Sequence, residues 1–106
     1  MDANLKAKWV AALRSGEYQQ GDTYLANNAA GTFCCLGVLC VARGLSPREL
    51  DRKCTIDVPF ESGLSREIRS LLGDEMNDRE RRTFSEIADW IEANIPADLP
   101  VAQGEG

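Results

Sequence analysis

The longest apolar run in the chain covers residues 34–42 and predicts a short buried helix. It contains no charged residue, no proline and no strongly hydrogen-bonding side chain. Because such a run cannot face water on any side, the other elements must pack around it. Arg43 in the last turn and Gly44 directly after it are typical helix-ending residues. The run is too short to cross a membrane, which takes about 20 apolar residues.

Apolar residues at helical spacing predict a helix near each end of the chain. The first starts at Asn4, a suitable N-cap, and ends at Gly16; we expect its Trp9 to anchor the core. The last opens with a capping box over residues 83–86 and ends at Pro96. The two apolar stripes consist of Leu5, Trp9, Ala12 and Leu13, and of Phe84, Ile87, Ala88, Ile91 and Ile95.

Shorter elements are predicted between residues 44 and 82. Residues 46–49 form a capping box with proline at the first helical position, which predicts one or two helical turns. Residues 54–60 contain a proline and predict an extended edge segment or loop. A further helix, ending at Gly73 and followed by a polar connector over residues 74–82, is predicted by Leu64, Ile68, Leu71 and Leu72.

Turn-forming residues at 27–31 predict a small β-hairpin ahead of the buried helix. A two-stranded hairpin alone is marginal in water, so we expect it to pack on the helices. Together these elements predict a helix-rich α+β fold with three to four helices and one hairpin around a cysteine-rich helix. With 106 residues, the chain is expected to form one globular domain over residues 1–96 and a flexible tail over residues 97–106.

The net charge of -5 is concentrated at the end of the chain. Residues 1–82 hold 12 acidic and 12 basic residues, whereas residues 83–106 hold five acidic residues and no basic one. Such a charge distribution repels nucleic acid and attracts a basic partner, so general nucleic-acid binding is not expected. The candidate partner-binding residues on the last helix are Glu86, Asp89, Trp90 and Glu92, although Trp90, at the flank of the apolar stripe, also fits the edge of the core.

The sequence contains no grouping typical of an active site. It has no histidine, which removes the usual general base and imidazole ligand. Cys34, Cys35 and Cys40 lie in the apolar run, where a reactive thiolate is disfavoured, and Cys54 beside Lys53 is more simply a surface thiol. The cysteines lack the C-x₂₋₄-C pairs of zinc sites, and no phosphate-binding or dinucleotide motif is present. We therefore expect no catalytic residue, metal site or cofactor.

Asn77 and Asp78 lie in the predicted polar connector. The buried helix has no good local cap unless Thr32 serves as one, so its first N–H groups need other partners. We hypothesise that Asp78 or Asn77 reaches across to this helix N-terminus and accepts hydrogen bonds from it.

Three sequence blocks in combination resemble a group of small phage and prophage proteins of unknown function. The blocks are W-x-x-A-L-R-S-G-x-Y-x-Q from Trp9, C-C-L-G-V-L-C from Cys34, and T-F-x-E-I-A-D-W-I from Thr83, the last preceded by an Asn-Asp pair. Those relatives usually have a glycine after this pair, where the present chain has Arg-Glu-Arg. The resemblance implies a phage origin and a binding role toward host proteins, without a mechanism. The amphipathic start of the chain does not resemble a signal peptide, so we expect a cytoplasmic location in the bacterial host.

Three functions remain open at this stage. The favoured one is a non-enzymatic binding protein, monomeric or homodimeric, that inhibits or modulates a host protein, such as a defence protein, through its acidic last helix. The second is a protein that binds or sequesters a small nucleotide ligand, with candidate residues Tyr18, Gln20, Asn77, Asp78 and Arg82 together with the arginines near it. The third is an enzyme that uses carboxylates or Cys54.

Overall fold

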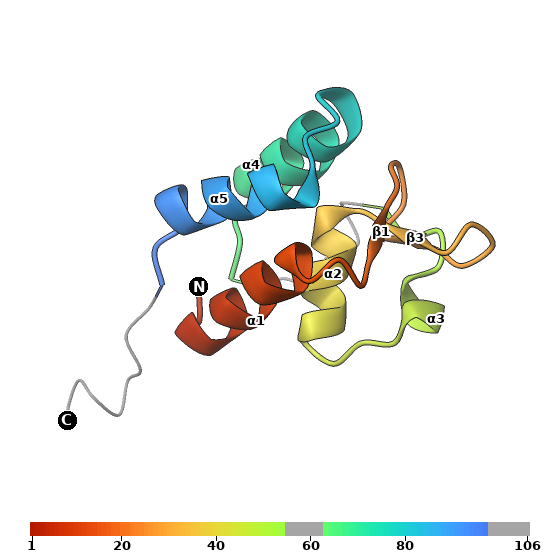
Figure 1. Cartoon of the computed structure of the whole chain (residues 1–106), viewed down its shortest axis with the longest axis horizontal. Helices are drawn as coiled ribbons and strands as arrows, with labels where there is room; N and C mark the ends of the chain where they lie inside the picture. Colours follow the sequence, from red (N-terminus) through yellow and green to blue (C-terminus); the bar gives the residue numbers. More distant parts are fainter. Residues whose placement is uncertain (55–62, 98–106) are drawn as a thin grey trace.

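The computed structural model describes residues 1–54 and 63–97. Its helices are α1 (Ala3–Arg14), α2 (Cys35–Ala42), α3 (Pro47–Leu50), α4 (Arg66–Ser70), the π-helix η3 (Leu71–Arg79) and α5 (Phe84–Asn94), and its strands are β1 (Gln19–Gln20), β2 (Ala26–Asn27) and β3 (Thr32–Phe33). This is the helix-rich α+β fold that the sequence predicts. Helix α2 lies between the α1 and α5 helices and the small sheet (Figure 1). None of the helices in the described ranges is long and apolar enough to cross a membrane.

The apolar run forms the central helix of the core, as predicted. Residues 35–40 of α2 are all buried, Arg43 is the C-cap, and Gly44 follows in a left-handed conformation with φ +102°. Trp9 is also fully buried, and its Nε1–H donates a hydrogen bond of 2.8 Å to the carbonyl of Cys35. The predicted core anchor is therefore confirmed, and it joins α1 to the first turn of α2.

The predicted hairpin is part of a larger, mixed sheet. Strands β2 and β3 pair antiparallel on either side of the predicted turn, which confirms the hairpin. Strand β1 pairs parallel with β3, giving the order β1-β3-β2, which the sequence analysis did not predict. Beyond β2, the N–H of Arg52 donates to the carbonyl of Ala26 at 2.8 Å and the N–H of Leu25 donates to that of Lys53 at 2.6 Å. The segment after α3 therefore extends the pairing on the β2 side.

The chain entering β2 crosses α2 in direct contact at Gly37. A Cβ atom at Gly37 would lie 1.7 Å from the backbone oxygen of Leu25, a distance that no side chain can adopt. The same oxygen accepts a 3.2 Å hydrogen bond from the N–H of Cys34. The absence of a side chain at Gly37 is thus what allows the sheet to contact the buried helix so closely.

The capping signals are confirmed at two helices and wrong at one. Both bonds of the predicted capping boxes are present at α3 and at α5, and the apolar stripe of α5 is buried. Helix α1, however, is capped by Asp2, whose carboxylate accepts a 2.8 Å bond from the N–H of Leu5. Asn4 lies inside the helix instead, because an acidic cap also interacts favourably with the positive end of the helix.

The helix predicted to end at Gly73 continues to Arg79, so the polar connector over residues 74–82 is wrong for most of its length. Helix α4 leads directly into η3, whose hydrogen bonds span five residues, and the N–H of Glu80 still donates to the carbonyl of Glu75 at 2.7 Å. Gly73 is buried in this helix, which packs against α2 and α5. Tertiary packing here overrides the low helix propensity of glycine. The extended segment predicted at residues 54–60 lies, after Cys54, outside the described residues. The tail predicted at residues 97–106 lies outside them after Ala97.

Candidate functional site

Asn77 is a buried polar residue that connects three parts of the fold. Its side-chain oxygen accepts hydrogen bonds from the N–H of Cys35 at 3.2 Å and from Nε2 of Gln20 at 3.0 Å. Its amide nitrogen donates to the carbonyl of Gly21 at 2.9 Å and to Oδ1 of Asp78 at 2.8 Å. Only 2% of the residue is exposed. The four bonds use both donors and both acceptor positions of a primary amide.

The hypothesis that the connector caps the buried helix is therefore confirmed for Asn77 and not for Asp78. Cys34 at the N-cap makes no side-chain cap bond, so the amide oxygen of Asn77 takes the place of a local cap. Asp78 acts one step further away, by accepting a bond from the Asn77 amide. In η3 each turn accommodates an extra residue, and Leu72, Met76 and Asn77 are all turned toward the core.

The Asn77→Asp variant is expected to lower the free energy of unfolding by about 2–4 kcal/mol. The change keeps the shape of the side chain but replaces its donor group with an oxygen, which then faces the Gly21 carbonyl and the Asp78 carboxylate. Urea unfolding followed by circular dichroism measures the loss. The same change at the exposed Asn28 is the control and should cost less than about 1 kcal/mol. Equal stability of the two variants would contradict a structural role for Asn77.

The fold brings together four of the five residues predicted to contact a ligand, but most of their polar groups bind one another. Gln20 donates through Nε2 to Asn77 and to the backbone carbonyl of Arg82, the latter at 2.6 Å. The Arg82 side chain pairs instead with Glu80. Tyr18 packs edge-on against Phe33 with ring centroids 5.3 Å apart, and no hydrogen bond joins it to this cluster among the described residues. Asn77 and Arg82 thus hold the structure together at this position.

A shallow hollow of about 240 Å³ opens beside this cluster. It is lined by Gln20, Gly21, Asp22, Asn77 and Arg81. Nη2 of Arg81 lies 3.9 Å from Oδ2 of Asp22, and the two side chains are 80% and 49% exposed. Asp22 was not predicted as a site residue, and Arg81 only as a neighbour of Arg82. No sequence signal indicates that residues 21–24 face residues 80–82, which lie about 60 positions away.

The predicted acidic contact residues lie on the outer face of α5, where two of them bind α1. Nη2 of Arg14 donates to Oδ1 of Asp89 at 2.6 Å and to Oε1 of Glu92 at 2.8 Å. These hydrogen bonds raise the pKa of Arg14. The two carboxylate side chains nevertheless remain 71% and 54% exposed.

The Glu86 side chain differs, because it accepts a 2.8 Å bond from the N–H of Thr83 in the capping box. Trp90 is partly buried against the core, in agreement with its place at the flank of the stripe.

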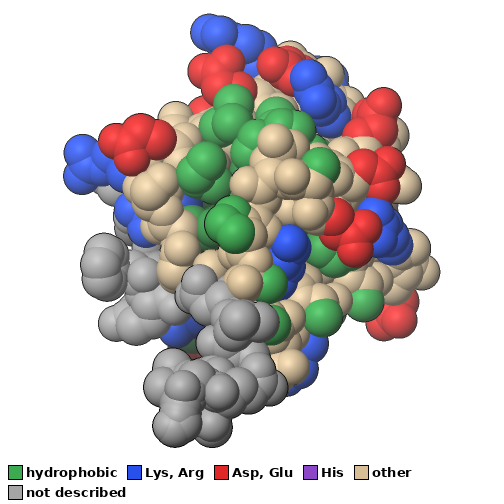
Figure 2. Space-filling view, turned by 90° about the vertical axis from the view of Figure 1, so that its left-hand side faces the viewer, with side chains coloured by type: hydrophobic (Ala, Val, Ile, Leu, Met, Phe, Trp, Pro, Cys, Tyr) green, Lys and Arg blue, Asp and Glu red, His purple; other side chains and the backbone are tan. Residues whose placement is uncertain are grey.

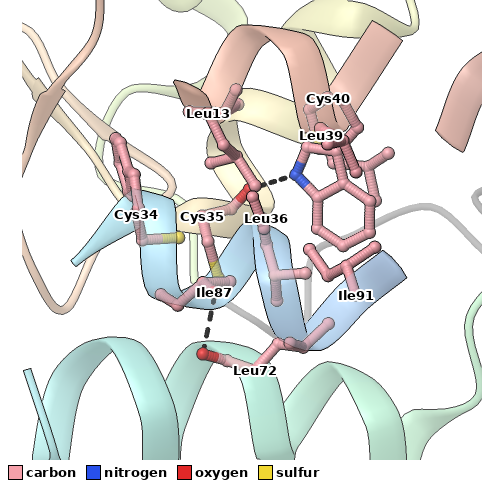
Figure 3. Close-up of a cluster of buried hydrophobic side chains, with 14 of the residues drawn as sticks. Leu13, Cys34, Cys35, Leu36, Leu39, Cys40, Leu72, Ile87 and Ile91 are labelled. Carbon is pink, nitrogen blue, oxygen red and sulfur yellow. Dashed lines mark hydrogen bonds between the residues drawn. The ribbon is translucent and has the colours of Figure 1, made fainter. Parts of the chain in front are cut away.

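Three of the four cysteines are core residues. Cys34, Cys35 and Cys40 are buried, and the first two lie beside Leu36 and Ile87 in the core (Figure 3). The Cys35 thiol donates to the carbonyl of Leu72 at 3.4 Å. Burial raises the pKa of Cys34 to about 12 and that of Cys40 to about 11, and it raises the pKa of Cys35 well above its ordinary value. These thiols are protonated at neutral pH and are not poised as nucleophiles.

Within residues 1–54 and 63–97, no group of three or more histidine, cysteine or acidic residues could hold a metal ion.

The first 44 residues match the family model of a domain of unknown function, DUF8296. The matched segment contains α1, the sheet and α2, and it ends at the glycine that terminates the buried helix. Comparison with curated proteins and with solved structures gave no match. The chain is thus similar over this segment to a domain without an assigned activity.

Proposed function

We propose that this protein acts by binding another protein through the outer face of α5, without catalysing a reaction. The observation that carries the proposal is the double contact from Arg14, which fixes Asp89 and Glu92 in place while leaving both exposed. Charged side chains that are already ordered lose less conformational entropy when a partner binds. One positive charge on Arg14 faces two negative charges on Asp89 and Glu92, so these three side chains together keep a net negative charge.

The partner that this surface suits presents lysine or arginine side chains. Helix α5 carries three carboxylates and no basic residue, and complementary charge favours fast and specific association. The left-hand side of Figure 1, where α5 ends, faces the viewer in Figure 2, and there hydrophobic side chains gather among charged ones of both signs.

The buried cysteines and Asn77 have structural roles. Three thiols are buried and protonated, and the amide of Asn77 has all four of its hydrogen bonds within the protein. The resemblance to small phage proteins adds the biological context of the proposal. We propose that the partner is a bacterial host protein, such as a defence protein, or another phage protein, and that binding modulates its activity.

The test compares two variants that each remove two exposed negative charges. The Asp89→Asn/Glu92→Gln variant neutralises the proposed surface and keeps the shapes of both side chains. The control, Glu17→Gln/Glu67→Gln, neutralises two exposed carboxylates outside α5. Each protein is cross-linked in bacterial lysate, and the captured proteins are identified by mass spectrometry.

We expect the wild type and the control to capture the same basic protein, and the α5 variant to capture at least about tenfold less of it. The capture should also weaken as salt concentration rises, because exposed charges are screened. Thermal melts must show that both variants are folded. Equal capture of that protein by the control and the α5 variant, or no protein captured by the wild type above the background of the lysate, would overturn the proposal.

A further inference from the structure

The two loops that flank the hollow each contain a non-glycine residue in a left-handed backbone conformation. Among the described residues such conformations occur at Thr23 (φ +74°), Arg52 (φ +58°) and Arg81 (φ +53°). Thr23 follows Asp22 at one side of the hollow, and Arg81 lines the other side. L-residues rarely adopt this region, where glycine is unstrained. Of the two arginines in this conformation, only Arg81 lines the hollow.

Polar groups at the hollow remain available for a ligand. The 3.9 Å between Arg81 and Asp22 is too long for a hydrogen bond, so each side chain retains hydrogen-bonding capacity. Gln20 makes its two side-chain bonds through Nε2, and its carbonyl oxygen Oε1 has no partner in the described ranges. Asn77, with its four internal bonds, fixes the floor beneath these groups. The hollow thus presents one donor group beside two acceptor groups on a rigid base.

We propose that this hollow binds the guanine base of a nucleotide. Guanine offers the acceptors O6 and N7, the pair that arginine recognises most often, next to the N1–H and N2–H₂ donors. Arg81 would donate to O6, and the Asp22 carboxylate and the Gln20 carbonyl oxygen would accept from the donors. Adenine carries an amino group where guanine carries O6, so it would place a donor against the Arg81 guanidinium. The base specificity follows from this donor and acceptor order.

The size of the hollow limits what enters it. At about 240 Å³ it is smaller than the sites of about 300–1,000 Å³ that enclose drug-sized ligands. It therefore accommodates a single base, with the ribose and phosphate outside it. This site is separate from the protein-binding surface proposed on α5, so either can fail without the other.

The decisive variant is Arg81→Gly, because it separates binding from folding. Glycine relieves the left-handed backbone, so we expect the thermal midpoint to rise by about 2–5 °C. The same change removes the guanidinium group, so the affinity for guanosine monophosphate should fall at least about tenfold. If Arg81 instead stabilised the fold, its replacement by glycine would lower the thermal midpoint. Affinities are measured by ligand-observed NMR on the full chain with guanosine and adenosine monophosphate as probes.

Arg52→Gly is the matched control. It removes the same charge from a residue with the same backbone conformation, but on the β2 side of the sheet and away from the hollow. We expect its midpoint to rise similarly while its affinity for guanosine monophosphate stays within about twofold of the wild type. Equal binding of the two nucleotides, no binding of guanosine monophosphate at millimolar concentration, or unchanged affinity in Arg81→Gly would each overturn the proposal. A lower midpoint for Arg81→Gly would overturn it as well.

Discussion

Replacing Gly37 by alanine is expected to lower the free energy of unfolding by at least about 3 kcal/mol, at the upper end of the cost of overpacking. The new methyl group would lie 1.7 Å from the Leu25 carbonyl oxygen, so either α2 or the chain entering β2 must move. Movement of that chain would also break the bond from the Cys34 N–H to the same oxygen. Domains of this kind have total stabilities of about 5–15 kcal/mol, so much of the folded population would be lost. Urea unfolding followed by tryptophan fluorescence measures the change.

Gly31→Ala is the control that separates crowding from backbone conformation. Gly31 has φ +72° in the hairpin turn, and a Cβ atom there would meet nothing within 4 Å. Alanine at this position is expected to cost only about 1–2 kcal/mol, which is the penalty of a left-handed conformation. If Gly37→Ala proved no more destabilising than Gly31→Ala, the close crossing between the chain and α2 would be contradicted.

The sequence predicts the elements whose side chains form periodic patterns. The run at 34–42 is apolar on all sides, and the stripe of α5 repeats over three turns, so burial alone determines both helices. The capping boxes at Ser46 and Thr83 mark two helix starts, because they require particular residue types at fixed spacing. Strand β1 has only two residues, which is too short for any alternation to be visible, so its parallel pairing with β3 was missed.

The errors occur where a tertiary contact decides the local structure. Gly37 lies inside the apolar run with no sequence signal of its own, since its requirement comes from the Leu25 backbone, which approaches from a different element. Gly73 resembles a helix stop, but the helix continues because packing against α2 and α5 stabilises it. Asn77 appeared to lie in a solvated connector, whereas its four hydrogen-bond partners make its burial favourable.

The candidate site could be predicted only in part for the same reason. The Asn77 contact with the buried helix follows from the missing local cap, which is visible in the sequence as an apolar helix start. The hollow lies between loops in which Thr23 and Arg81 have left-handed conformations, and neither residue type suggests them. The carboxylates of α5 lie off its apolar stripe, which is visible in the sequence. Their contact with Arg14 is not, because Asp89 and Glu92 lie 75 and 78 positions from Arg14 along the chain.

Raising the pH from 8 to 10 is expected to lower the free energy of unfolding by about 5–6 kcal/mol, because three buried thiols stay protonated in the folded state and ionise in the unfolded state. Burial raises the pKa of Cys34 to about 12, that of Cys40 to about 11, and that of Cys35 well above its ordinary value. In the unfolded chain these thiols ionise near pH 8.5. Above pH 8.5 the unfolded state binds fewer protons than the folded state. The contribution of the thiols to stability is therefore fully present below about pH 8.5 and is lost as the pH rises toward about 11.

The contribution of single thiols can be measured with two alanine variants under reducing conditions. Cys40→Ala removes one of the three buried groups, so the loss of stability between pH 8 and pH 10 should shrink by about one third. Cys54→Ala removes an exposed thiol and is the control for loss of a cysteine outside the core. Comparison with the wild type cancels the titration of all other groups, since both variants retain them. An identical pH dependence in all three proteins would show that ionisation of the Cys40 thiol is not coupled to unfolding, and that the core at α2 admits water.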